Sequence, residues 1–173
     1  MIPLSQQTGV GLVEVLVAVL LLSVAVLGFS ALQLRAISAT DESLVRTQAL
    51  SIVRGLAENM RANPLQVATY ETAINAAGLT TKSDNSCRKL ETACTSEEIA
   101  IKESNNVVAK LDKYDIRIGI VTCPGTSGFS EIKCIIAVWG DTKTMMDDTD
   151  AQACASADGT YKSGSNCLIV EAY

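Results

Sequence analysis

Few side chains in this sequence could carry out chemistry, and none of them forms a catalytic pattern. The 173 residues include no histidine, which excludes a Ser-His or Cys-His nucleophile pair. The carboxylate pairs Glu97–Glu98 and Asp147–Asp148 are adjacent in sequence, so they point in different directions on a helix or strand, and we interpret them as solvated charges. The glycine-containing turn at residues 124–128 lacks the Gly-Lys-Ser/Thr of a phosphate-binding loop. We therefore expect a protein that is not an enzyme and needs no cofactor.

Cysteine is the most informative residue type. All six cysteines lie beyond a long apolar N-terminal run, and an even number on the exported side of a membrane favours disulfides. Without histidine or a Cys-x-x-Cys spacing, a metal site is not expected. Pairing neighbours would close three loops of roughly 8–14 residues, each stabilising by about 2.5–3 kcal/mol. This simplest pairing is Cys87–Cys94, Cys123–Cys134 and Cys154–Cys167.

The apolar run covers residues 10–34 and contains one ionisable side chain, Glu14. About 20 apolar residues in a helix cross a bilayer, so the run predicts a membrane-spanning helix. An intramembrane carboxylate usually has a partner, although Glu14 lies near the start of the run, where an unpaired carboxylate costs less. A cleaved secretory signal is the alternative. Such signals have a basic leader and an apolar core of roughly 7–15 residues, whereas residues 1–9 contain no Lys or Arg.

A second helical segment, residues 35–62, continues the first. Its apolar residues recur at spacings of three and four, which predicts one buried stripe along an amphipathic helix. Asn63–Pro64 should end this helix. Gly28 and Gly55 interrupt the continuous helix expected over residues 10–62, and we interpret them as places of close helix–helix approach. The stripe consists of Ile37, Val45, Ala49, Ile52, Val53, Leu56 and Met60.

The remaining residues, 63–173, predict a small α+β head. We expect helices within 65–79 and 96–111, and strands at 114–121, 132–139 and 167–173, with an irregular polar segment at 140–164 between the last two strands. Short consecutive strands favour an antiparallel sheet, which would pack on the amphipathic helix. The net charge of −5 lies entirely in residues 65–173, and because an acidic head is a poor electrostatic match for a phosphate backbone, we do not expect nucleic acid as a partner.

The N-terminal residues resemble a known motif. Gly9 followed by Val-Gly-Leu-Val-Glu is similar to the prepilin cleavage site of type IV pilins and type II secretion pseudopilins. The resemblance implies that residues 1–9 are a leader, that Val10 becomes an N-methylated N-terminus, and that Glu14 pairs with the N-terminal amine of a neighbouring subunit. The sequence departs from the motif at Val10, at Gly11 and in its uncharged leader, which leaves orientation less well specified.

Two further blocks, residues 27–35 and 58–64, resemble PilV-type minor pilins. The resemblance implies a minor pilin that takes part in pilus assembly or initiation. Its head, residues 63–173, would lie in the periplasm, anchored in the inner membrane by residues 10–34 through a stem at 35–62, before incorporation into the pilus. Partners would be a prepilin peptidase, the major pilin, other minor pilins and the inner-membrane assembly platform. A type II secretion pseudopilin is the main alternative, and a signal-anchored periplasmic enzyme or binding domain is a third.

Overall fold

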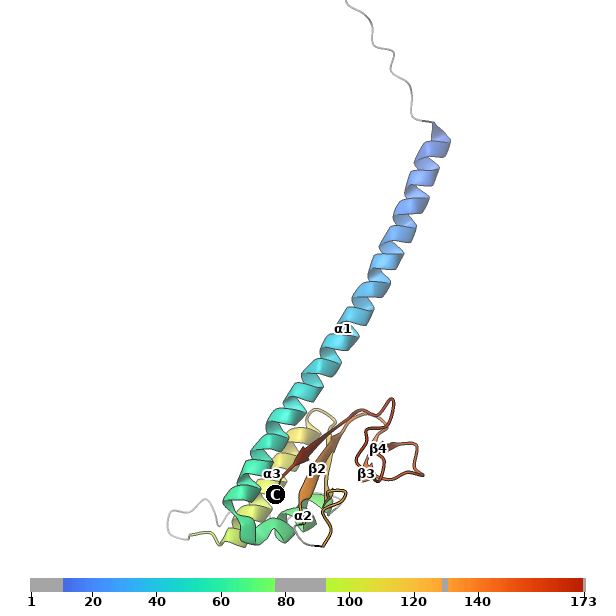
Figure 1. Ribbon diagram of the computed structural model, residues 1–173. Helices are drawn as coiled ribbons and strands as arrows, with labels where there is room; N and C mark the ends of the chain where they lie inside the picture. Colours follow the sequence, from blue (N-terminus) through green and yellow to red (C-terminus); the bar gives the residue numbers. More distant parts are fainter. Residues whose placement is uncertain (1–10, 77–92, 129–130, 173) are drawn as a thin grey trace, which may run out of the picture. The chain divides into compact units, whose positions relative to one another are not determined.

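The computed structural model describes residues 11–76, 93–128 and 131–172 (Figure 1). The chain divides into two compact units, Met1–Ser43 and Leu44–Tyr173. The elements are α1 (Leu12–Ala62), the short 3-10 helix η1 (Pro64–Gln66), α2 (Val67–Asn75), α3 (Ser96–Asp112), β1 (Arg117–Thr122), β2 (Lys133–Val138), β3 (Lys143–Met146), β4 (Ala153–Ala155) and β5 (Cys167–Glu171). A long apolar helix followed by a mixed head confirms the predicted α+β class.

In the first unit, α1 exposes apolar side chains on all sides. The chain contains one described helix long and apolar enough to span a membrane, with a mean hydropathy of 2.8 over its best window. The hydroxyls of Ser23 and Ser30 donate hydrogen bonds to carbonyls four residues earlier, at 2.7 and 2.9 Å. These polar groups are therefore satisfied within the helix, as an apolar environment requires.

In the second unit, α1 contributes one face to the core of the head. Its buried residues repeat at spacings of three and four, which confirms the amphipathic stripe in this part of the helix. Val45 and Ile52 are partly buried against the same core, whereas Ile37, in the first unit, is exposed. The helix ends at Ala62, as predicted from Asn63–Pro64. The buried residues are Ala49, Val53, Leu56, Ala57 and Met60.

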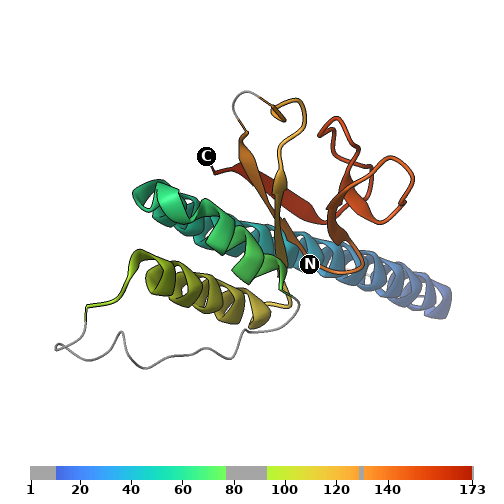
Figure 2. The same cartoon turned by 90° about the horizontal axis from the view of Figure 1, so that it is seen from below.

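The sheet has the strand order β1-β2-β5 and is antiparallel throughout, which confirms that prediction. Successive residues of β2 face opposite sides. Ile135 and Ala137 belong to the core shared with α1, α2 and α3, while Ile136 and Val138 pack with Cys154 and Cys167 in a second cluster. Figure 2 shows the helices and the β3–β4 region around the sheet. The head therefore has apolar contacts on both faces of the sheet.

The segment predicted to be irregular contains two short strands, so that prediction was wrong. Strands β3 and β4 pair in parallel with an irregular register. The Lys143 ammonium bonds Asp150 at 2.6 Å, and the Lys143 N–H donates to the carbonyl of Gln152 at 2.7 Å. Gly119 of β1 allows β3 to approach, since a Cβ at this position would lie 3.0 Å from the Cβ of Thr144. These strands are defined by long-range contacts rather than by their own sequence.

The helices of the head start and stop near the predicted positions. Thr95 and Glu98 form a reciprocal capping box at the start of α3, which satisfies two free N–H groups, and α3 ends one residue beyond the prediction. The helix predicted within residues 65–79 corresponds to α2, which ends at Asn75. Residues 77–79 of this prediction lie outside the described residues. Strand β1 begins three residues late because Asp115 adopts a positive φ of 55° in the turn that precedes it.

Candidate assembly site on the long helix

Glu14 lies in the first turn of α1 and is exposed. Its N–H donates a hydrogen bond to the carbonyl of Gly11 at 2.9 Å, so the backbone is already helical at this position. A carboxylate in the first turn interacts favourably with the helix dipole. Gly9 and Val10, the predicted cleavage site and N-terminus, lie outside the described residues. Their roles, and the pairing of Glu14, remain predictions.

The surface around Glu14 is almost wholly apolar. The large apolar side chains of α1 between Leu12 and Leu34 are 51% to 78% exposed. A monomeric soluble protein rarely exposes an apolar patch larger than a few hundred Å². This surface must therefore be covered by lipid, by other protein, or by each in turn. In either environment an ionised Glu14 is costly unless a cation pairs with it.

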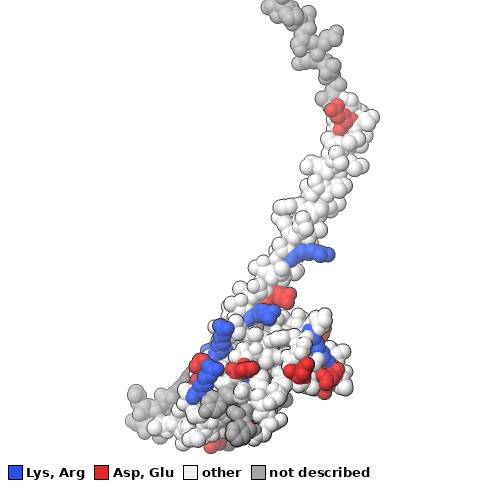
Figure 3. Space-filling view, in the orientation of Figure 1, with Lys and Arg blue, Asp and Glu red and all other residues white. Residues whose placement is uncertain are grey.

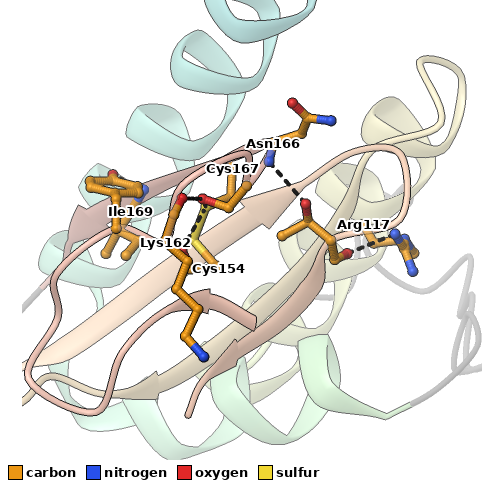
Figure 4. Close-up of a disulfide and its surroundings, with 9 residues drawn as sticks. Arg117, Cys154, Lys162, Asn166, Cys167 and Ile169 are labelled. Atoms are coloured by element: carbon orange, nitrogen blue, oxygen red, sulfur yellow. Dashed lines mark hydrogen bonds between the residues drawn. A yellow bond between two sulfur atoms is a disulfide. The ribbon is translucent and has the colours of Figure 1, made fainter. Parts of the chain in front are cut away.

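The head is held together by disulfides. Cys123 and Cys134 are bonded across the β1–β2 hairpin with a Cα–Cα distance of 5.0 Å. Cys154 of β4 and Cys167 of β5 are bonded with a Cα–Cα distance of 5.8 Å, and both are buried (Figure 4). These are two of the three neighbour pairs expected from the sequence. Cys94 is also disulfide-bonded, and Cys87 lies outside the described residues.

Polar side chains fix the segment between β2 and β5 around the Cys154–Cys167 disulfide. The Lys162 ammonium donates to the carbonyls of Asp148 at 3.1 Å and Asp150 at 2.7 Å. At the other end of the segment, Arg117 donates to the carbonyl of Thr142 at 2.8 Å, and the Thr142 hydroxyl accepts from the N–H of Asn166 at 2.9 Å (Figure 4). Sequence reasoning missed these contacts because a polar segment alone does not show which side chains turn inward.

We call residues 141–158 the acidic loop, because they contain five aspartates. The hydroxyl of Thr149 and the N–H groups of Asp150 and Thr149 bond the Asp147 carboxylate and lower its pKa. The Lys143 ammonium and the N–H of Gln152 lower the pKa of Asp150, and the N–H of Thr160 lowers that of Asp158. These carboxylates therefore stay ionised at neutral pH. The aspartates are Asp141, Asp147, Asp148, Asp150 and Asp158.

The carboxylate pairs considered in the sequence have structural partners. Glu98 caps α3 through Thr95, and Asp148 accepts a hydrogen bond from the N–H of Ala157 at 2.9 Å. Among the described residues, no group of three or more metal-ligating side chains lies close enough to hold a metal ion. The sites of interest are therefore contact surfaces: the apolar half of α1 with Glu14, and the charged surface of the head.

Comparison with known proteins gives one family. Residues 31–102 match the model of the Tt1218-like family, described as type IV pilin Tt1218. The matched segment runs from the apolar part of α1 through α2 into α3, and it includes neither the Gly9–Glu14 motif nor the sheet. No curated protein and no solved structure matches this chain. Over residues 31–102 the chain is therefore similar to type IV pilins, and its long N-terminal apolar helix and disulfide-bonded α+β head agree with that similarity.

Proposed function

We propose that this chain is a minor pilin of the PilV type. It would be cleaved after Gly9 by a prepilin peptidase, methylated at Val10 and held in the inner membrane by residues 10–34 with its head in the periplasm. From there the assembly platform would incorporate it, with other minor pilins and the major pilin, into a type IV pilus. The observation that carries the proposal is the single carboxylate on the exposed apolar surface of α1 in a chain whose residues 31–102 are similar to type IV pilins.

The physical role of Glu14 follows from its surroundings. An α-amine and a carboxylate are each costly in an apolar environment unless they are paired. In a bundle of α1 helices, the Val10 amine of one subunit would neutralise Glu14 of its neighbour, and a subunit in the wrong axial register would leave both charges unpaired. Glu14 would thereby select the register of assembly rather than contribute to the fold of the chain.

Mass spectrometry of the N-terminal peptide from membrane-purified protein tests processing. A peptide that starts at Val10 with one added methyl group is the expected result. An intact leader, or a start near Ser30 or later, contradicts it. Deleting the gene then distinguishes the two machineries, because loss of pili supports the pilus and loss of a secreted protein with normal pili supports a type II secretion pseudopilin.

The assembly role of Glu14 is tested in sheared pili. Glu14→Ala should leave the amount in the membrane unchanged but remove the protein from the pilus fraction, since an unpaired buried charge costs about 3–5 kcal/mol. Ser30→Ala is the matched control. It also removes a polar group from the apolar half of α1, but one whose hydroxyl bonds its own helix. Normal amounts of Glu14→Ala in sheared pili would contradict the role.

A further inference from the structure

Strand β5 forms one edge of the three-stranded sheet, because among the described strands it pairs with β2 alone. Just beyond β5, the N–H of Ala172 donates a hydrogen bond to the carbonyl of Lys133. In an antiparallel pair, the residues whose backbone groups bond to the neighbouring strand alternate along the chain. The backbone N–H and carbonyl groups of Cys167, Ile169 and Glu171 therefore point away from β2, toward the free edge.

The composition of β5 makes this edge suitable for pairing with another strand. Its sequence, Cys-Leu-Ile-Val-Glu, consists mainly of residues that favour strands, and Glu171 is its only charge. An apolar edge strand adds a strand from another chain unless charge, a bulge or a covering segment prevents it. Figure 3 shows charged side chains gathered over β3 and β4. The protection of β5 itself must come mainly from something other than its own charge.

The side chain of Tyr161 occupies the central donor of this edge. Its hydroxyl oxygen accepts a hydrogen bond from the N–H of Ile169, the middle residue of β5, at 2.9 Å. The carbonyl oxygen of an added strand would take the same position, because backbone N–H···O bonds have this length. The Tyr161 hydroxyl and an added strand therefore cannot accept from the Ile169 N–H at the same time.

Tyr161 is held beside β5 by its own backbone contacts. It forms an isolated antiparallel bridge with Ala155, the last residue of β4, and the next residue, Lys162, donates its N–H to the carbonyl of Cys154 at 3.2 Å. The Cys154–Cys167 disulfide connects this turn of chain to β5 (Figure 4). Tyr161 is 48% exposed, so filling the core of the head does not explain a tyrosine at this position.

We propose that Tyr161 closes the free edge of the sheet and prevents β5 from pairing with β5 of a second copy of this chain. An antiparallel pair with a two-fold axis at Ile169 would join the two Ile169 residues by reciprocal N–H···O bonds. Those bonds need the N–H that Tyr161 occupies. The inference concerns the head alone, and it does not depend on the proposed function.

Hydrogen exchange of the Ile169 amide in the full-length, detergent-solubilised protein measures the contact. Tyr161→Phe removes only the hydroxyl, and the Ile169 amide should then exchange about three- to tenfold faster, since one hydrogen bond is lost. Tyr114→Phe is the matched control. Tyr114 is similarly exposed, at 44%, but it lies in the turn between α3 and β1, so this variant should leave the Ile169 amide unchanged.

Pairing between copies is measured by co-isolation of two differently tagged full-length chains. Tyr161→Ala removes the ring as well as the hydroxyl and should raise co-isolation several-fold, whereas Tyr114→Ala should not. A peptide with the sequence of residues 166–172 and the change Cys167→Ser should suppress the increase, because it adds to the same edge. If Tyr161→Ala unfolds at a lower temperature than Tyr114→Ala, Tyr161→Phe replaces it and should give a smaller increase in co-isolation.

Three results would overturn the inference. Unchanged exchange at Ile169 in Tyr161→Phe would show that the hydroxyl does not protect the edge. Faster exchange with unchanged co-isolation of the Tyr161 variants would show that the hydroxyl only satisfies a local N–H group. An increase in co-isolation that the peptide does not suppress, or that Tyr114→Ala shows equally, would place the association on another surface. Cleavage after Gly9 is measured separately, so none of these results bears on the proposed function.

Discussion

Asn75 forms two hydrogen bonds with Ile120 that imitate the pairing of a neighbouring strand. Its side-chain nitrogen donates to the Ile120 carbonyl at 2.7 Å, and its side-chain oxygen accepts from the Ile120 N–H at 2.9 Å. Ile120 lies in β1, an edge strand of the sheet, whose outer backbone groups would otherwise lack partners in the ladder. One amide on the last turn of α2 therefore joins this helix to the sheet.

This geometry predicts a pH-dependent effect for Asn75→Asp. At pH 7 a carboxylate still accepts from the Ile120 N–H, but its second oxygen faces the Ile120 carbonyl. The unfolding free energy should fall by about 1–3 kcal/mol. The carbonyl disfavours the charged form, so the folded-state pKa of the new carboxyl rises above the unfolded value near about 4. Native protein then binds more protons than unfolded protein, and the lost stability returns as the pH falls.

Urea unfolding at pH 7 and at about pH 4 measures this recovery. Asn106→Asp is the control, because Asn106 is exposed on α3 and the same chemical change there should alter stability little at either pH. A constant deficit of Asn75→Asp across the pH range would contradict the expected donor–acceptor arrangement.

Sequence reasoning could not find Asn75, and the reason is general at this scale. Asn75 and Ile120 are 45 residues apart, and an asparagine near a helix end is equally compatible with a cap or a solvated surface. The same holds for Tyr70, which is buried and donates its hydroxyl to Glu103. Burial, and then Glu103, raise the pKa of Tyr70. Glu14, in contrast, could be identified from the sequence because one carboxylate in an apolar run is unusual whatever the fold.

At the scale of elements, regular patterns predicted the structure and irregular ones did not. The period of α1, its end at Asn63–Pro64, the alternation in β1 and the continuous apolar run of β2 depend on local sequence. Strands β3 and β4 have three or four residues each and depend on Lys143, Asp150 and a disulfide. Short strands of this kind do not carry enough local preference to be recognised, because their conformation is imposed by tertiary contacts.

The two described disulfides should therefore differ in importance. Cys123–Cys134 closes a hairpin whose strands already pair over six residues, whereas Cys154–Cys167 holds the short strand β4 against the second cluster. Replacing Cys154 and Cys167 with serine should lower the unfolding free energy toward the upper end of about 2–4 kcal/mol. It should also open residues 139–166 to limited proteolysis.

Replacing Cys123 and Cys134 with serine is the matched comparison. We expect a cost at the lower end of that range and no new cleavage between β2 and β5. Equal protease resistance of the two double variants would show that the polar contacts of Lys162 and Arg117 suffice to hold this segment without the Cys154–Cys167 disulfide.

At the scale of the whole molecule, the exposed apolar half of α1 and the acidic surface of the head are the two surfaces available to other molecules. The family match covers the C-terminal two thirds of α1, α2 and part of α3, while the sheet and the acidic loop carry no such match. The similarity to type IV pilins therefore rests on the stem and the first helices of the head, and neither the sheet nor most of the apolar run contributes to it.

The titratable groups of the whole chain predict the pH range in which the head is stable. The chain has no histidine, so no side chain has an ordinary pKa between about 5 and 8. Hydrogen bonds from Lys133 and Thr122 lower the pKa of Glu131. Hydrogen bonds within the acidic loop and its surroundings likewise lower the pKa values of Asp147, Asp150 and Asp158. A carboxylate with a lowered folded-state pKa stabilises above its unfolded pKa, and this stability is lost as the pH falls through the folded value.

Lys133 and Tyr70 set the alkaline limit with the opposite sign, because both have pKa values that are raised in the folded protein. Burial by itself lowers the pKa of Lys133, but Glu131 at 2.5 Å and Glu71 at 2.8 Å outweigh burial and raise it. The stability from Lys133 is fully present below about pH 10.5 and is lost only as the pH rises through the raised folded value.

The unfolding free energy of the oxidised protein should therefore be constant between about pH 5 and 9 and fall below about pH 4. Denaturant unfolding across pH 2–11 measures it. A slope between pH 5 and 8 would require a titrating group that these residues do not provide, whereas Lys133→Met should change the alkaline limb without creating such a slope.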